Sequence, residues 1–82
     1  MQISKPNQYT PSADEIEAML NESLIDLDFR LTKMRKKPLA LIHTCASLAT
    51  ELRKRGSVDA RLALVNRHYS EARLTEREVS DA

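Results

Sequence analysis

The sequence is poor in the residues that a β-sheet or a disulfide-stapled domain requires. It contains one glycine, one cysteine, one phenylalanine and no tryptophan among 82 residues. A sheet protein would need turn glycines and more β-branched residues. Leucine, alanine, glutamate, arginine and lysine, which are strong helix formers, are abundant instead. We therefore predict an all-α fold.

The sequence also has little net charge and no long apolar run, and both features limit the partners and the compartment that we expect. The net charge is +1 from 13 basic and 12 acidic side chains, a balance that demands neither a nucleic acid nor an anionic membrane as partner. No apolar run approaches the roughly 20 residues needed to span a bilayer. The first residues lack the apolar segment of a signal peptide, and the lone Cys45 is typical of a reducing compartment. We expect a cytoplasmic protein with no membrane partner.

Apolar spacing and capping signals predict three helices. Ser12 and Glu15 can form a capping box at the first helix. Pro38 suits the first position of the second helix, and Gly56 suits the left-handed residue that follows its end. The predicted helices span about 12–36, 38–55 and 58–73.

These helices form one predicted helical domain over residues 12–74. We expect residues 1–11 to be a flexible N-terminal arm, because they contain prolines and show no apolar periodicity. We expect residues 75–82 to be a frayed tail in which a short last turn could start at Thr75.

Pro38 leaves two architectures open. The apolar residues on either side of it follow a single heptad register, so one long kinked helix could pair with another copy. Alternatively, the chain turns back at Lys36 and Lys37 to make a helical hairpin. We favour the hairpin, because an interior proline costs about 3 kcal/mol or more. With the third helix it makes a small antiparallel three-helix bundle. A domain this short has a thin stability margin, so we expect a homodimer or the small partner of a heterodimer.

The first predicted helix has a second apolar ridge opposite its main one. Ala18, Ile25, Phe29 and Thr32 form this ridge, and Phe29 is the sole phenylalanine of the chain. Three interpretations remain open: the third helix packs against the ridge, the ridge binds a partner or a second copy, or Phe29 is a solitary exposed aromatic. The protein-binding candidates are Ile25 and Phe29, followed by two residues that leave the main apolar line of the third helix, Leu64 and Leu74.

The sequence offers little for catalysis. Cys45 lies on the apolar line of the second helix, His43 on its polar face, and His68 on the flank of the third, where it could hydrogen-bond across an interface. No histidine has metal-ligand spacing, and a single glycine cannot build a phosphate loop. We predict that the protein is not an enzyme and that it takes no metal, cofactor or small-molecule substrate.

Two clusters of basic residues suggest an alternative function. In this alternative the protein is a small dimeric regulator that binds nucleic acid. Each cluster lies at the C-terminal end of a predicted helix, where cations also complement the helix dipole without any ligand. No aromatic residues interleave with them to stack on bases. The candidate nucleic-acid-binding residues are Arg35, Lys36, Lys37, Arg53, Lys54 and Arg55.

The sequence therefore favours a non-enzymatic helical adaptor or regulator that acts by protein–protein binding. In size and helix pattern it is similar to small two- or three-helix adaptors such as secretion co-chaperones, anti-activators and plasmid or phage regulators. This likeness involves no specific residues and implies only the class of function.

Overall fold

Every regular element of the described chain is a helix. The computed structural model describes the backbone of residues 10–81 and the side chains of residues 10–77. Four α-helices and one 3-10 turn follow one another, which confirms the all-α prediction. They are α1 (Ala13–Leu20), α2 (Leu24–Lys33), η1 (Met34–Lys36), α3 (Pro38–Lys54) and α4 (Ala60–Asp81). None of the described helices is both long enough and apolar enough to cross a membrane.

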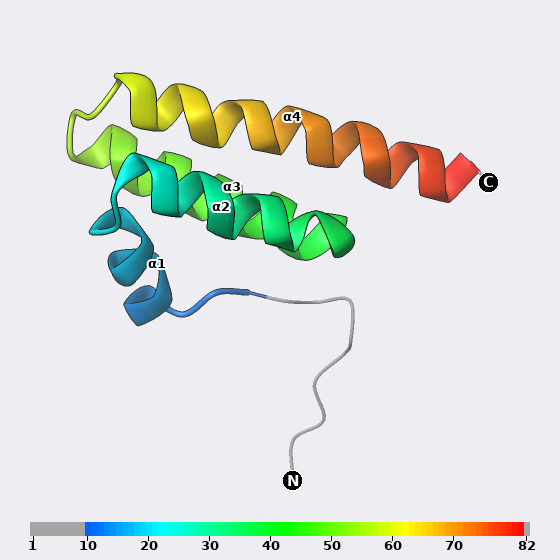
Figure 1. Cartoon of the computed structure of the whole chain (residues 1–82), viewed down its shortest axis with the longest axis horizontal. Coiled ribbons are helices and arrows are strands. Elements are labelled where there is room, and N and C mark those ends of the chain that lie inside the picture. The colour runs from blue at the N-terminus through cyan, green and yellow to red at the C-terminus, as the bar shows by residue number, and fades with distance from the viewer. Residues whose placement is uncertain (1–9, 82) are drawn as a thin grey trace, which may run out of the picture.

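The chain reverses direction at Pro38, between α2 and α3 (Figure 1). Figure 1 shows α2 and α3 running in opposite directions, with α4 antiparallel to α3 and α1 set across one end of the bundle. Lys37 leaves the helical region at φ −127° and ψ 80°, and Pro38 then occupies the first turn of α3. Proline fits there because the first amides of a helix have no intrahelical partner.

The core lies between α2, α3 and α4, with α1 closing one end. Apolar side chains spaced three or four residues apart on each helix point inward and become inaccessible to solvent. The residues exposed by 2% or less are Leu27, Leu31, Leu41, Thr44, Cys45, Leu48, Leu52, Val65 and His68. The buried residues of α1 are Ile16, Met19 and Leu20.

The single helix predicted over residues 12–36 is wrong, because the chain breaks between α1 and α2. The capping box of Ser12 and Glu15 does start α1, with hydrogen bonds of 2.9 and 3.1 Å. Ser23 then caps a second helix by accepting a hydrogen bond from the amide of Asp26 at 3.1 Å. A serine hydroxyl competes well with a helical carbonyl for such an amide. Ala18 therefore lies on α1 and does not share a helix with Phe29.

The end of the second helix was predicted correctly. Gly56 has a φ of +75°, in the left-handed region that favours glycine. Its amide donates to the carbonyl of Arg53 at 3.0 Å, and the amide of Ser57 donates to that of Leu52 at 2.9 Å. These two bonds make a Schellman motif, which ends α3 and turns the chain toward α4.

The third helix differs from its predicted bounds of 58–73 at both ends. It begins at Ala60, and it continues to Asp81 through the segment predicted to be frayed. Thr75 was predicted to start a new turn, but its hydroxyl donates to the carbonyl of Glu71 at 3.0 Å within the helix. Residues 1–9 of the predicted arm and residue 82 of the predicted tail lie outside the described residues. Pro11, the last residue of the predicted arm, is buried.

Candidate functional site

The outward side of α2 carries two large apolar side chains. Ile25 is 81% exposed and Phe29 is 62% exposed, whereas Leu27 and Leu31 on the opposite side are fully buried. Residues four apart lie one above the other on a helix, so Ile25 and Phe29 form one ridge. The hypothesis that the third helix covers this ridge is wrong, since the Leu27 and Leu31 side of α2 faces the core instead.

A shallow groove runs beside this ridge, between α2 and the start of α4. Its apolar lining comes mainly from small and aliphatic side chains, and Asp28 and Arg67 also line it. Leu64, a predicted binding residue, is buried at 9% exposure and lies in this lining. Leu24 is 42% exposed and also lines the groove. Sequence reasoning missed Leu24 because it falls on the apolar line of the first predicted helix. The apolar lining residues are Leu24, Ile25, Ala60, Ala63 and Leu64.

Leu74, the remaining predicted binding residue, is separate from this surface. It is 59% exposed on α4 but does not line the groove. Ten residues of helix separate it from Leu64, which corresponds to about 15 Å along the axis. The structure therefore brings together Ile25, Phe29 and the edge formed by Leu64, and leaves Leu74 apart.

Charged side chains flank the ridge. The Lys33 ammonium lies 4.6 Å from the centre of the Phe29 ring, within the range of a cation–π contact. Arg30 pairs with Glu22 at the start of α2. Arg61 of α4 reaches the same turn and donates to the backbone carbonyl of Glu22 at 2.7 Å.

A polar network centred on the buried His68 links α2 and the η1 turn to α4. His68 is fully buried, and its Nε2 lies 2.7 Å from Oδ1 of Asp28. Its Nδ1 lies 3.4 Å from a guanidinium nitrogen of Arg35, which can only donate. The ionised carboxylate of Asp28 can only accept, so the Nε2–H of the ring donates this hydrogen bond. Arg35 also pairs with Glu71, and Arg67 lies 3.3 Å from Asp28.

This network favours the ionised form of Asp28. The hydrogen bond from His68, together with the positive charges of Arg67 and Arg35, lowers the pKa of Asp28 below its ordinary value of 3.8. Both nitrogens of the His68 ring have partners within the chain, and the ring has no access to solvent. The sequence suggested that His68 could hydrogen-bond across an interface; its partner in the structure, Asp28, lies on another helix of the same chain.

Cys45 is a buried thiol on α3. It is inaccessible to solvent, and burial raises its pKa to about 12. A thiol reacts through its thiolate, which is scarce at neutral pH when the pKa is so high. His43 of the same helix is exposed. No group of three or more metal-ligating side chains occurs among the described residues.

We expect Cys45 to react with a disulfide reagent such as DTNB only after the chain opens. At pH 8 the thiolate fraction should be about a thousandfold lower than for an exposed cysteine. The measurement is the rate of colour development in buffer and in 6 M guanidinium chloride, with a His43→Cys, Cys45→Ala variant as the exposed control. Equal rates for native Cys45 and the control would show that the thiol is accessible.

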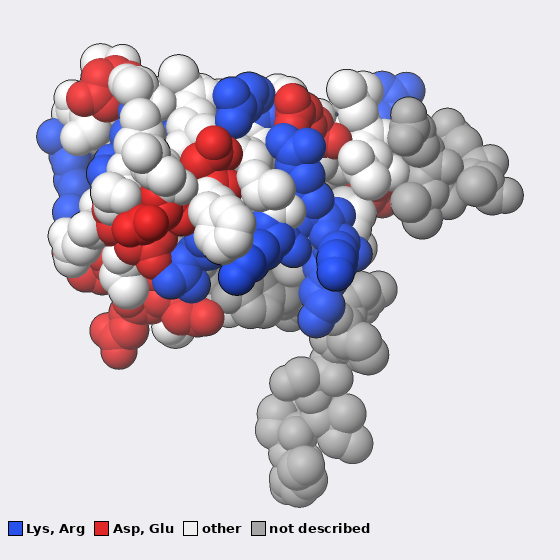
Figure 2. Space-filling model, in the orientation of Figure 1, with Lys and Arg blue, Asp and Glu red and all other residues white. Residues whose placement is uncertain are grey.

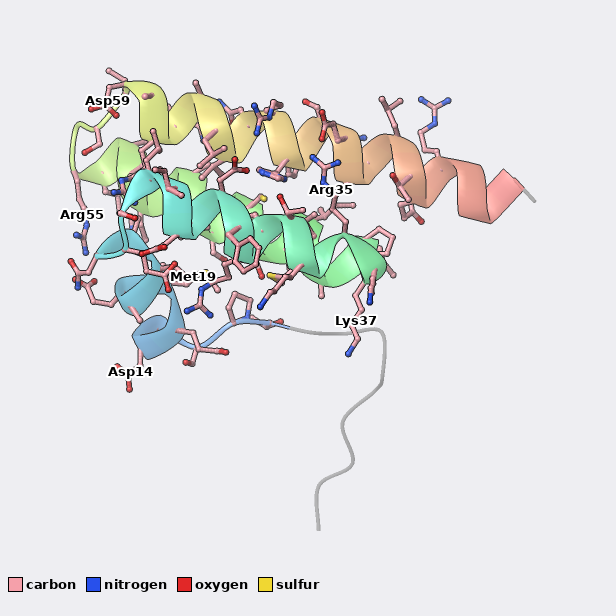
Figure 3. The ribbon with its side chains drawn as sticks, viewed as in Figure 1. Asp14, Met19, Arg35, Lys37, Arg55 and Asp59 are labelled. Carbon is pink, nitrogen blue, oxygen red and sulfur yellow. The ribbon has the colours of Figure 1, made fainter. Side chains whose placement is uncertain are left out.

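The two basic clusters lie at opposite ends of α3. Its 17 residues correspond to about 25 Å along the axis. Figure 3 labels Arg35 and Lys37 toward one end of the bundle and Arg55 toward the other. Three of the six cations are paired within the chain: Arg35 with Glu71, Lys54 with Glu51, and Arg55 with Glu17 at 2.5 Å. Lys36, Lys37 and Arg53 are exposed.

The chain has been compared with protein-family models, curated proteins and solved structures. No match was found in any of the three comparisons. The surface of α2 and the contacts that fix its orientation are therefore the basis for assigning a function.

Proposed function

We propose that this protein is a small helical adaptor or regulator, of the co-chaperone, anti-activator or phage and plasmid regulator class, that acts by binding another protein. The observation that carries the proposal is the ridge of Ile25 and Phe29, left uncovered on the outside of a helix whose other side is fully packed. Large aliphatic and aromatic side chains grouped in this way mark interaction surfaces, because their burial supplies most of the binding free energy.

The shape of the surface supports a helix-in-groove mode of binding. The Ile25 and Phe29 ridge stands beside the groove formed by α2 and α4, so a partner helix lying along α2 would contact both. The exposed edge of Leu24 adds apolar area at the N-terminal end of α2. Lys33 and Arg30 supply a polar rim around the apolar centre, as is usual for protein interfaces.

Protein binding is better supported than nucleic-acid binding. Affinity for a duplex depends on several cations that contact successive phosphates along one surface. The six candidate cations divide between two ends of the bundle, and half of them are neutralised within the chain. A heparin column provides the direct comparison: a nucleic-acid binder would elute late and with a steep dependence on salt.

We expect Phe29→Asp to abolish capture of the partner while leaving the fold intact. The full chain would be immobilised and exposed to an extract of its source cells, and bound proteins would be quantified by mass spectrometry. A charge at the centre of an apolar interface should lower capture by about 30-fold or more. Leu74→Asp tests the competing exposed leucine, and His43→Asp, which adds the same charge on the exposed side of α3, is the matched control.

Two results would decide against this surface. If a protein captured by the wild-type chain is retained equally by Phe29→Asp, the ridge is not the binding site. If Leu74→Asp alone loses it, the site lies on α4 instead. Circular dichroism at 222 nm and the melting temperature must match the wild type for each variant, so that loss of capture is not caused by unfolding.

A further inference from the structure

The charges on the outward side of α2 change sign along the helix. Asp26 lies three residues before Phe29, and Lys33 lies four residues after it. All three are exposed, and neither Asp26 nor Lys33 makes an ion pair with any residue that the structure describes. Lys36 continues the basic end. In Figure 2 acidic side chains lie over the start of α2 and basic ones gather toward its end.

A helix with this pattern is complementary to itself when two copies lie antiparallel. With Phe29 at the centre, Asp26 of one copy falls within about one residue, or 1.5 Å along the axis, of Lys33 of the second copy. A two-fold axis repeats the same contact, so two opposite-charge pairs form together. The Ile25 and Phe29 side chains of both copies would lie between these pairs and become buried. A parallel arrangement would instead bring like charges together.

We propose that the surface of α2 is covered by a second copy of this chain, packed antiparallel about Phe29. The inference rests on the proposed function, because it identifies what occupies the same binding surface in the isolated protein. One ten-residue helix is about 15 Å long. Such a contact is small beside the roughly 1,200 Å² of a standard interface, so the dimer should be weak and in rapid exchange. A different protein partner would bind by displacing the second copy.

The first test is the mass of the full chain as a function of concentration. Sedimentation equilibrium or light scattering over roughly 1–500 µM covers the range of a weak interface. We expect the wild-type mass to rise from one chain toward two, and Phe29→Asp to weaken association by about 30-fold or more. His43→Asp should associate as the wild type does.

The second test uses two charge-reversal variants. Each should weaken dimerisation when it is alone, and the two should dimerise normally when they are mixed. In Asp26→Lys, two lysines meet at each symmetric contact, and in Lys33→Glu, two acids meet there. Each variant alone should dimerise about tenfold more weakly than the wild type. An equimolar mixture of the two variants should recover wild-type association, since both contacts of the mixed dimer are again between opposite charges. Mixing leaves each folded monomer unchanged, so a folding effect cannot explain the recovery.

The outcomes separate this inference from the proposed function. If the wild-type chain stays monomeric at every concentration, the proposed dimer is wrong. If Phe29→Asp still abolishes partner capture in that case, the proposed function holds without the dimer. If the wild-type chain dimerises but mixing the two charge variants does not restore association, the antiparallel arrangement is wrong. Recovery on mixing, together with partner capture that Phe29→Asp leaves unchanged, supports the dimer and contradicts the proposed function.

Discussion

Leu31→Ala should lower the free energy of unfolding by about 2–5 kcal/mol, whereas Phe29→Ala should change it by about 0.5 kcal/mol or less. The two residues are neighbours on α2, but Leu31 is fully buried and Phe29 is 62% exposed. Truncating Leu31 removes its transfer free energy and leaves a cavity. Alanine at position 29 removes little packing and has the higher helix propensity.

The effect of Leu31→Ala is large relative to the whole stability. A domain of 82 residues has a free energy of unfolding on the order of 4–12 kcal/mol. Urea titration followed at 222 nm measures both variants. It should be done at about 1 µM chain, because self-association would otherwise stabilise the wild type by mass action. Equal losses for the two variants would mean that Phe29 packs in the core and that the orientation assigned to α2 is wrong.

The contact between His68 and Asp28 should produce the second largest change. We expect His68→Ala to lower the free energy of unfolding by about 2–4 kcal/mol at pH 7, since it empties a fully buried site and removes a hydrogen bond to a carboxylate. Urea titration at pH 7 measures this loss. A loss below about 0.5 kcal/mol would show that the buried ring contributes little to holding α4 against α2.

The contact between His68 and Asp28 should also make the free energy of unfolding depend on pH. The pKa of Asp28 is lower in the folded chain than its ordinary value of 3.8. At a pH between these two pKa values, the folded chain therefore binds fewer protons than the unfolded chain. The stabilisation from Asp28 is therefore complete above its ordinary pKa and is lost as the pH falls through the lowered one.

Asp28→Asn should remove this contribution. The fall in unfolding free energy between pH 6 and pH 2.5 should be smaller in this variant than in the wild type. Asp26→Asn removes the same charge from the same helix without a histidine contact, and is the control. If both variants follow the same profile, the interaction with His68 does not stabilise the fold.

Local signals were the most predictable part of this fold. The capping box of Ser12, the helix start at Pro38 and the helix end at Gly56 depend on residues within one turn, and all three were predicted correctly. The break before Ser23, between α1 and α2, was not predicted. The apolar spacing of Leu20, Leu24 and the following leucines stays helical across it, so periodicity alone gives no sign that the axis changes direction.

The surface was less predictable, because it depends on how the helices are arranged. Ile25 and Phe29 could be identified as an unusual ridge, but only the position of α4 determines whether the ridge is covered. The burial of Leu64 depends on the same packing. The contact between Asp28 and His68 joins residues 40 apart in the chain, and no local pattern indicates such a pair.

The anchoring of α2 has a consequence for the entropy of binding. A ten-residue helix is marginal in water on its own and would normally lose conformational freedom when a partner orders it. Here Leu27 and Leu31 hold its inner side in the core, and Asp28 ties it to α4 through His68. Arg35, in the η1 turn that follows α2, adds an ion pair with Glu71 of α4. That ordering occurs when the chain folds. A partner would therefore meet a rigid surface, and little of the binding free energy would be spent on organising it.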